Sequence, residues 1–269
     1  FPRSAFSIRR SAFRVQRSEF KMIHVEGFRK SYRETVAVED LSFSVEPGQV
    51  LGLLGPNGAG KTTTMRAIAG IIPPTGGRLN VAGHDVVTEP VAAKRVLAYV
   101  PDDPRLFDAL TVWEHLQFIA AAYDVRDWQP VGERLLAEFE LTEKRDALAQ
   151  ELSRGMRQKV AICCAYLYEP KALMLDEPLT GLDPRGIRTM KSSLKSAALR
   201  GAAVIVSSHL LALVNDLCTH LLILHKGKKL FAGPVAEARA AFAGIAGDGG
   251  DASLEEVFFR ATEGARSPT

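Results

Sequence analysis

The amino-acid sequence predicts an α/β protein in which an all-helical segment is inserted into a strand-rich core. From Met22 onward, short apolar runs of strand character alternate with segments of helical periodicity. Residues 111–168 instead have helical periodicity throughout. A glycine-rich turn, Gly55–Thr63, stands between a strand-like run and a helix-like run, an order that is typical of α/β folds.

The individual elements follow from the same patterns. Seven apolar runs are expected to form strands: Met22–Phe28, Leu41–Val45, Gln49–Leu54, Val96–Val100, Leu173–Leu175, Ala203–Ser207 and Leu221–Leu224. Between them, Thr62–Ile71 and Gly186–Leu199 have the apolar spacing of helices. Within the helical segment, Thr111 is followed three residues later by Glu114, which is the pattern of a capping box, and Pro130 is expected to begin the next helix.

Composition is that of an ordinary globular protein. Of the 269 residues, 46% are hydrophobic and 24% are charged, which excludes a wholly disordered chain. The most apolar region, 202–224, is interrupted by polar residues, so we expect a soluble chain without a membrane-spanning helix. The three cysteines lack the spacing of metal ligands and favour a reduced cytoplasm. Cys163 and Cys164 are either a redox pair or, as we expect, two buried residues of a helix.

Basic residues concentrate in the tail formed by residues 1–21. Because this tail has six Lys or Arg and one Glu, the rest of the chain is near neutral despite the net charge of +3, and we expect no nucleic-acid partner. A seven-residue repeat, seen at Arg3–Phe6, Arg10–Phe13 and Arg17–Phe20, fits an amphipathic membrane anchor, an organelle transit peptide, or translated upstream DNA with the true start at Met22. We favour the third interpretation and expect the tail to be disordered and dispensable.

The glycine-rich turn matches the phosphate-binding pattern G-x-x-x-x-G-K-T. Its residues are Gly55, Pro56, Asn57, Gly58, Ala59, Gly60, Lys61, Thr62 and Thr63. Glycines let successive N–H groups turn inward around an anion, and the N-terminus of the following helix adds its dipole. Lys61 would reach the β- and γ-phosphates, and the Thr62 hydroxyl would ligate Mg²⁺. The turn therefore predicts a nucleotide site.

Two carboxylates follow the apolar run Leu173–Leu175. Asp176 would lie beside the Mg²⁺, and Glu177 would polarise the water that attacks the γ-phosphate. A strand that ends in Asp-Glu is by itself often only an edge or a cap. Together with the phosphate-binding turn, however, it predicts a catalytic site.

A further motif, Leu152–Gln158, opens a helix that we expect over Met156–Tyr168. A serine and a glycine at a helix start, here Ser153 and Gly155, expose a hydroxyl and N–H donors to an anion. The alternative is that Ser153 only caps the helix. The position of the motif, at the end of the helical segment and shortly before the Asp-Glu strand, favours the anion-binding interpretation.

The order of these motifs resembles that of the ATP-binding subunit of ATP-binding cassette (ABC) transporters, over essentially all of residues 22–269. The resemblance rests on five motifs: Gly55–Thr63, Leu152–Gln158, Asp176-Glu177, Gly181-Leu182-Asp183 and His209. It implies a P-loop NTPase of the ABC-ATPase type, with a RecA-like core lobe, an inserted helical lobe and an antiparallel β portion. The lobes are expected at 22–100 with 169–215 (core), at 101–168 (helical), and at 216–269 (C-terminal extension).

The resemblance also implies roles for single residues. Tyr32 would stack on adenine, the alternative being an ordinary surface-loop tyrosine. His209 would contact the γ-phosphate and the attacking water, and would thus be catalytic together with Lys61 and Glu177. Asp183 would lie at the interface of a dimer and help to link its two nucleotide sites.

Two departures from the family pattern concern the predicted site. Asp102 stands where the family usually has a glutamine that meets the metal, so a carboxylate would add charge there. In Leu152–Gln158, which resembles the signature motif of the family and is called the signature-like motif below, Arg154 and Met156 replace the commoner Gly and Gln, whereas Ser153 and Gly155 are kept. Both departures resemble exporter branches whose membrane-spanning half is a separate chain, and we expect ATP hydrolysis to be retained with altered coupling.

The extension beyond residue 216 carries two expected elements. Leu221–Ala232 has the pattern of a hairpin, and Ser253–Thr262 that of an amphipathic helix. The start of that helix, Leu254–Phe258, is similar to the close of many exporter ATPase subunits. It is also compatible with a helix that simply packs on the core.

The function implied by the resemblance is ATP hydrolysis that powers translocation, and export in particular, through a separate membrane permease. ATP and Mg²⁺ would be the cofactors. A second copy of the chain would complete a head-to-tail dimer, in which the segment Ser153-Arg154-Gly155 covers the γ-phosphate on the partner's loop. The chain would then lie peripherally at the cytoplasmic face of the cell membrane.

Three other functions compete with transport. A cytosolic ABC-type ATPase of translation or DNA repair usually carries two cassettes or long inserted arms, and neither is seen. A small-molecule kinase would need the phosphate loop but not Leu152–Gln158 or His209. A catalytically weak regulatory ATP binder is disfavoured by the full set of expected catalytic residues, Lys61, Asp176, Glu177 and His209, although Asp102 leaves it open.

Overall fold

The computed structural model describes residues 21–208 and 216–243. The predictions for the basic tail, for His209 and for the helix at Ser253–Thr262 therefore concern residues that lie outside the described ranges. Among the described residues, no helix combines the length and the apolar character that crossing a membrane requires.

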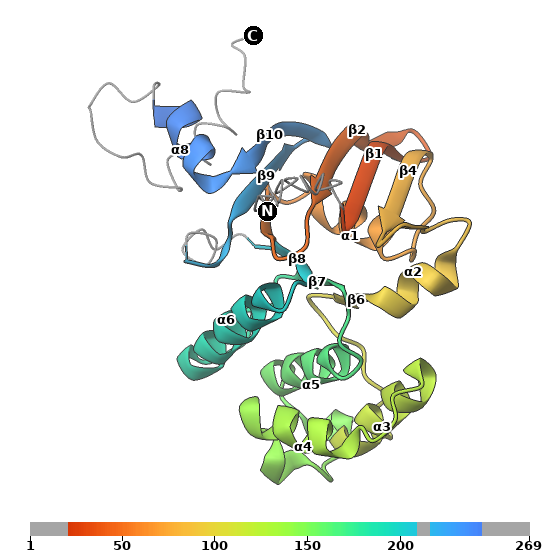
Figure 1. The fold of residues 1–269 in the computed structure, drawn as a ribbon, viewed down its shortest axis with the longest axis vertical. Helices are drawn as coiled ribbons and strands as arrows, with labels where there is room; N and C mark the ends of the chain where they lie inside the picture. The colour runs from red at the N-terminus through yellow and green to blue at the C-terminus, as the bar shows by residue number, and fades with distance from the viewer. Residues whose placement is uncertain (1–20, 209–215, 244–269) are drawn as a thin grey trace, which may run out of the picture.

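A six-stranded sheet forms the centre of the described chain (Figure 1), with the strand order β10-β9-β3-β8-β7-β6. Its strands are β3 (Val50–Leu54), β6 (Leu97–Val100), β7 (Ala172–Asp176), β8 (Ala203–Ser207), β9 (His220–His225) and β10 (Lys228–Pro234). Strands β3 and β6 to β9 run parallel, whereas β10 returns antiparallel to β9. The hairpin expected at Leu221–Ala232 is thus confirmed, with slightly longer arms.

A second, antiparallel sheet has the order β2-β1-β4-β5. Its strands are β1 (Ile23–Tyr32), β2 (Thr35–Val45), β4 (Gly76–Val81) and β5 (His84–Asp85). The sequence analysis predicted the apolar parts of β1 and β2 but neither β4 nor β5. In β4 only Leu79 and Val81 are buried, which is too short an alternation to be recognised from sequence.

The helices of the described chain are α1 (Lys61–Ile68), α2 (Pro90–Val96), α3 (Val112–Tyr123), α4 (Gln129–Glu138), α5 (Arg154–Tyr166), α6 (Pro184–Leu199) and α8 (Val235–Ala243). The capping box of α3 is confirmed: the Thr111 hydroxyl accepts from the Glu114 N–H at 3.1 Å, and the Glu114 carboxylate accepts from the Thr111 N–H at 2.7 Å. The prediction that 111–168 is helical throughout is wrong, because only single 3-10 turns at Thr142–Lys144 and Ala149–Glu151 lie between α4 and α5.

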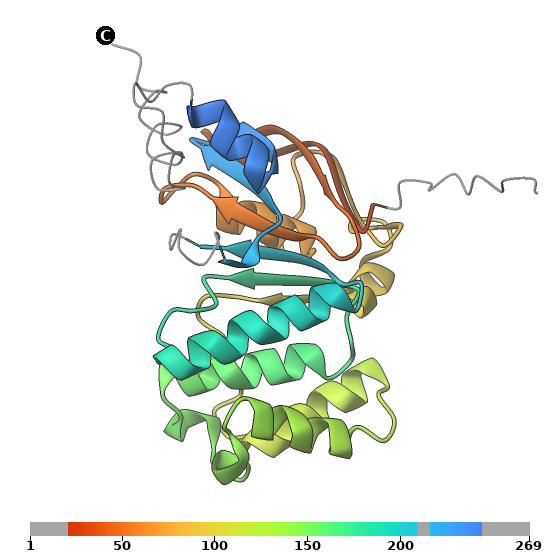
Figure 2. The ribbon, with the colours of Figure 1, turned by 60° about the vertical axis from the view of Figure 1, so that its left-hand side comes forward.

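The central sheet is covered on both faces. Along β7, Leu173 and Leu175 face one apolar cluster together with residues of α3 to α6, while Ala172 and Met174 face the other cluster together with α1 and the antiparallel sheet. Figure 2 shows the antiparallel sheet, the six-stranded sheet and the helices α5 and α6 as successive layers, with α3 and α4 beyond α5. Because successive side chains of one strand point to opposite faces of the sheet, each of the strands β3, β7 and β8 contributes to both apolar clusters.

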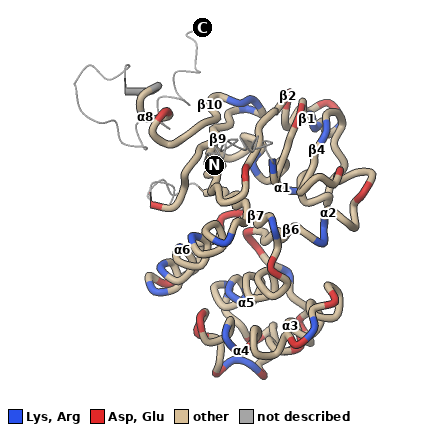
Figure 3. The backbone as a smooth tube through the Cα atoms, viewed as in Figure 1, with Lys and Arg blue, Asp and Glu red and all other residues tan. Residues whose placement is uncertain are grey.

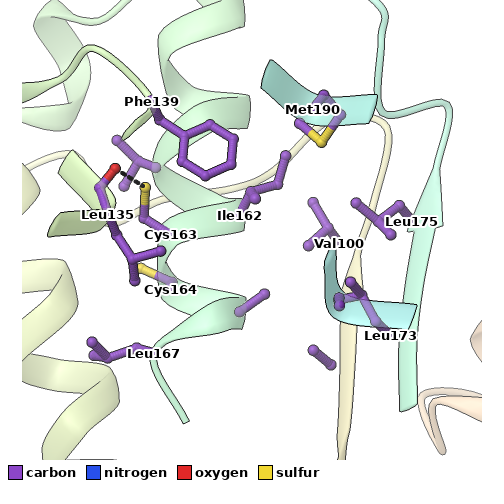
Figure 4. Packing of buried hydrophobic residues seen from close by; sticks show 14 of the residues in the cluster. Val100, Leu135, Phe139, Ile162, Cys163, Cys164, Leu167, Leu173, Leu175 and Met190 are labelled. Atoms are coloured by element: carbon purple, nitrogen blue, oxygen red, sulfur yellow. Dashed lines mark hydrogen bonds between the residues drawn. The ribbon is translucent and has the colours of Figure 1, made fainter. Parts of the chain in front are cut away.

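The two adjacent cysteines belong to this core (Figure 4). Cys163 and Cys164 are both buried in α5, and the Cys163 thiol donates to the carbonyl oxygen of Leu135 at 3.7 Å. Burial raises the pKa of Cys164 to about 12, so this thiol stays protonated at neutral pH. The expectation of two buried residues in a helix is confirmed.

Candidate functional site

The carboxyl ends of neighbouring parallel strands bring the polar groups of the site together. The phosphate loop leaves β3 after Leu54, Asp176 ends β7, and Ser207 ends β8 directly opposite Asp176 in the strand register. Because β3, β8 and β7 are neighbours in the sheet, these three chain segments meet at one edge. Parallel α/β sheets bind their ligands at this edge.

The loop has a shape that only glycine permits at two of its positions. At Gly55, a Cβ would lie 2.5 Å from the carbonyl oxygen of Leu224, and at Gly60, where φ is +100°, it would lie 2.8 Å from that of Ala37. At Gly58, by contrast, no atom of the described residues lies within 4 Å of an added Cβ. The loop is therefore seated tightly on β2 and β9 and stays open at Gly58, where an incoming phosphate could approach.

Lys61, the first residue of α1, closes the loop from inside. Its side chain is only 8% exposed, and its ammonium group donates to the carbonyl oxygens of Gly55 at 2.7 Å and Pro56 at 3.2 Å. Burial lowers the pKa of Lys61, and the nearby carboxylates of Glu177 and Asp176 oppose that shift. A buried cation beside a glycine-rich loop, at the N-terminus of α1, fits a bound polyphosphate.

A group of hydroxyls surrounds the Asp176 carboxylate, which is 3% exposed. The Thr62 hydroxyl donates to one carboxylate oxygen at 2.8 Å, and Ser207 donates a short hydrogen bond to the other. The phenol of Tyr99 approaches the first oxygen at 3.5 Å. Hydroxyl and carboxylate oxygens are the ligands that Mg²⁺ prefers, so this group fits that ion.

Two members of this group, Ser207 and Tyr99, are not predicted from the sequence as site residues. The sequence pattern places Ser207 only at the end of one apolar run and Tyr99 only within another. The usable signal was the predicted parallel sheet itself, since polar residues at the carboxyl ends of adjacent strands must meet.

Glu177 has an unusual backbone. Its φ is +48°, in the left-handed region that costs a non-glycine residue about 1–2 kcal/mol. The conformation is held because the Glu177 N–H donates to the Ser207 carbonyl oxygen at 3.1 Å. Backbone strain of this kind is concentrated at functional sites, where it directs a side chain that an ordinary strand would place elsewhere.

The signature-like motif lies at the start of α5. Ser153 caps the helix, because its hydroxyl accepts from the Met156 N–H at 3.3 Å, so α5 begins at Arg154 rather than at Met156 as predicted. Gly155 packs directly on Gly181, and a Cβ at Gly155 would collide with the Gly181 carbonyl oxygen. The side chain of Ser153 is exposed, so the cap leaves one side of its hydroxyl open to solvent.

Three other predicted residues lie away from the loop contacts described above. Asp102 pairs with Arg154 at 2.7 Å. Asp183 caps α6 by accepting from the Gly186 N–H at 3.1 Å, with the Lys159 ammonium 4.0 Å away. Tyr32 is the last residue of β1 rather than part of a loop; it is 46% exposed, and the Lys30 ammonium lies 4.9 Å from its ring centre.

The structure therefore assembles one part of the predicted site and leaves another part separate. Lys61, Thr62, Asp176 and Glu177 converge at the phosphate loop. Among the described residues, no group of three or more His, Cys, Asp and Glu side chains is placed to hold a metal ion, so Asp102 does not join Asp176 and Glu177 in such a cluster. Its carboxylate is engaged by Arg154 instead.

Comparison with known proteins gives a consistent picture. Residues 38–180 match the family model described as ABC transporter. The chain is 34% identical to the ABC-type transporter ATP-binding protein EcsA of Bacillus subtilis, over 90% of this chain and 97% of that protein. It is also 34% identical to the Nod factor export ATP-binding protein I of Cupriavidus metallidurans, over 79% of this chain and 71% of that protein.

A solved structure described as the ATP binding subunit of an ABC transporter matches with a TM-score of 0.84 and 33% identity, covering 89% of this chain and 99% of that one. The likeness thus spans both sheets and the helical segment as well as the phosphate loop. By its fold, its nucleotide-binding edge and these extended likenesses, the chain belongs to the ABC transporter family, as an ATP-binding subunit with ATPase activity.

Proposed function

We propose that this subunit hydrolyses ATP to power transport, and export in particular, through a separate membrane permease. The observation that carries the proposal is the Thr62–Asp176–Ser207 group beside the buried Lys61, at the mouth of the phosphate loop. A kinase would need an acceptor site as well, whereas ATP hydrolysis needs only these groups for the nucleotide and its Mg²⁺, Glu177 to activate water, and the second half-site described below.

The residues at the phosphate loop, which form the first half of the site, each have a specific role in this proposal. The ammonium group of Lys61 turns from the Gly55 carbonyl toward the β- and γ-phosphates, and Thr62 and Asp176 hold Mg²⁺, which would neutralise phosphate charge when bound. Glu177 accepts the proton of the attacking water as general base. Tyr32 stacks on adenine, and His209, outside the described ranges, contacts the γ-phosphate.

The second half of the site comes from another copy of the chain. Ser153 and Arg154 are exposed at the start of α5, where the Ser153 hydroxyl accepts from the Met156 N–H and Arg154 pairs with Asp102. A helix N-terminus with an open hydroxyl is suited to an anion supplied from outside. We infer that it covers the γ-phosphate on the partner's loop in a head-to-tail dimer, with Asp183 at the interface.

The proposal of a permease partner has two supports. The relative from Cupriavidus metallidurans is named for export, and this chain matches 71% of it. On the helical segment, Phe107 and Phe118 are 56% and 49% exposed, with ring centres 5.3 Å apart. Exposed neighbouring aromatics of this kind form part of an apolar surface that a membrane partner can cover. Such a partner would hold the chain at the cytoplasmic face of the membrane.

The catalytic part of the proposal is tested with Glu177→Gln. Loss of the general base should lower ATP hydrolysis by about 10²-fold or more, and ATP should then trap a dimer that size-exclusion chromatography detects. Glu169→Gln is the matched control, because Glu169 also has a left-handed backbone, with φ +49°, but is exposed at the far end of α5. A Glu177→Gln variant that stays monomeric with saturating ATP would count against the dimer.

The transport part is tested by affinity purification from detergent-solubilised membranes of the native cell, followed by mass spectrometry. Recovery of a polytopic membrane protein in roughly equal amount is the expected result. Recovery only from the soluble fraction, with ribosomal or DNA-bound partners, would overturn transport and leave the ATPase activity standing.

A further inference from the structure

The two departures from the family pattern, Asp102 and Arg154, are in contact with each other. One guanidinium nitrogen of Arg154 lies 2.7 Å from a carboxylate oxygen of Asp102 and 3.5 Å from its main-chain carbonyl oxygen. Asp102 lies on the connection between β6 and the helical segment, and Arg154 is the first residue of α5. The contact therefore ties the entry of the helical segment to the start of its last helix, α5, and Figure 3 shows acidic and basic positions close together where β6, β7 and α5 converge.

A third segment supports the arginine. The Cγ and Cδ atoms of Arg154 lie 3.8 Å from the position that a Cβ would take at Gly181, so the side chain extends along the loop that follows β7. Gly155 packs on the same glycine. The loop after β7 also carries Asp183, which we place at the dimer interface. Arg154 therefore lies beside the surface proposed to contact the partner subunit.

Electrostatics explain why Arg154 needs an anion at all. A helix N-terminus carries partial positive charge, so a cation in the first turn is unfavourable unless an anion lies nearby. The first turn of α5, all of it within the described chain, contains no acidic residue. Asp102 supplies the missing negative charge from a different segment.

This contact is well suited to being exchanged. The side chains of Arg154 and Asp102 are 51% and 46% exposed, and ion pairs at such exposure contribute little net stability. A phosphate group offers a guanidinium a stronger, bidentate, charge-assisted interaction. A nucleotide presented by a second subunit would therefore compete successfully with Asp102.

We propose that Asp102 is a positioning residue that holds Arg154 within its own subunit, and that the partner's ATP takes the place of Asp102 as the anion at the start of α5. The inference rests on the head-to-tail dimer of the proposed function. Asp102 then sets the ATP concentration at which two subunits pair, and its release frees the connection between β6 and the helical segment when they do.

The test measures ATP-dependent dimerisation in the Glu177→Gln background, by size-exclusion chromatography over a range of ATP concentrations. Asp102→Asn removes the competing charge and should lower the ATP concentration for half-maximal dimerisation by about fivefold, the scale of an exposed ion pair. Arg154→Gln should raise that concentration by a similar or larger factor. The double variant should match Arg154→Gln alone, because Asp102 acts only through Arg154.

Controls separate this effect from general damage. Asp216→Asn breaks an ion pair of 2.8 Å with Lys191 of α6, which the proposal does not involve, and should leave the ATP dependence unchanged. Thermal unfolding checks that each variant folds. The proposed exchange of Asp102 for ATP would be wrong if Asp102→Asn and Arg154→Gln shift the ATP concentration for half-maximal dimerisation in the same direction, or if their effects simply add. Neither result would contradict the dimer itself. If the parent forms no ATP-dependent dimer, the head-to-tail dimer of the proposed function and this inference both fail, whereas ATP hydrolysis by the wild type is judged by its own test.

Discussion

The two halves of the candidate site are built in opposite ways. Around the phosphate loop, Lys61 is 8% exposed and Asp176 is 3% exposed, and each contacts groups of its own chain. At the start of α5, Ser153 is exposed, and the side chains of Arg154 and Asp102 are 51% and 46% exposed.

The contrast supports the proposal that only the half-site at α5 depends on a partner subunit. Buried polar groups are costly unless they are satisfied, so a half-site of this kind must be assembled when the chain folds. Exposed polar groups are already hydrated, so leaving them without a protein partner until a second molecule binds costs little free energy. One subunit therefore carries an assembled loop for ATP, whereas in the proposed dimer the surface at α5 would become functional only against the partner subunit.

The largest effect is expected from removing the buried cation. Lys61→Ala should lower ATP hydrolysis by about 10²–10³-fold, the usual cost of losing one preorganised group that stabilises transition-state charge. Phosphate release measures it. Lys229→Ala is the control, since that ammonium also donates to a main-chain carbonyl, of Ser42 at 2.8 Å, but on an exposed edge. A loss of activity below about tenfold would contradict the claim that the buried Lys61 ammonium stabilises the charge of the transition state.

A moderate effect is expected at the contact between α5 and the loop after β7. In Gly155→Ala the new methyl group collides with the Gly181 carbonyl oxygen, so the free energy of unfolding should fall by about 1–3 kcal/mol. Urea unfolding measures this. At Gly76 the nearest atom to an added Cβ is 3.8 Å away, so Gly76→Ala should change stability by no more than about 0.5 kcal/mol. Equal losses of stability in the two variants would mean that the start of α5 shifts to accommodate the methyl group at little cost.

The smallest effect concerns Tyr99. Burial, and next the charge of Asp176, raise the pKa of Tyr99 to about 12, from 10. The folded protein therefore keeps the phenol protonated where the unfolded chain loses the proton, so this stability is complete below pH 10 and is lost as the pH rises through 12. Unfolding free energies at pH 9, 10 and 11 should fall more steeply in the wild type than in Tyr99→Phe, by at most about 1 kcal/mol per pH unit because solvent screens the half-buried phenol. Parallel curves would refute the assignment.

Prediction from sequence succeeded where local chemistry decides the conformation. The capping box at Thr111 and Glu114, the strand Ala203–Ser207 and the glycine-rich loop all depend on residues close together in the chain. It failed for β4, which is ordered by pairing with β1, and for β5, which is ordered by pairing with β4, rather than by their own patterns. It also failed between α4 and α5. The sequence keeps a helical periodicity there, but the chain forms only short 3-10 turns.

The sequence by itself determined the motifs, their order and the chemistry that each can perform, because glycines, a lysine and carboxylates at fixed spacing leave few alternatives. Only the tertiary structure decided which of them meet. It placed Ser207 on Asp176 through the register of two parallel strands, and it joined Asp102 to Arg154, which are 52 residues apart. Contacts of that kind depend on how strands and helices pack, and packing is a property of the whole chain rather than of any segment.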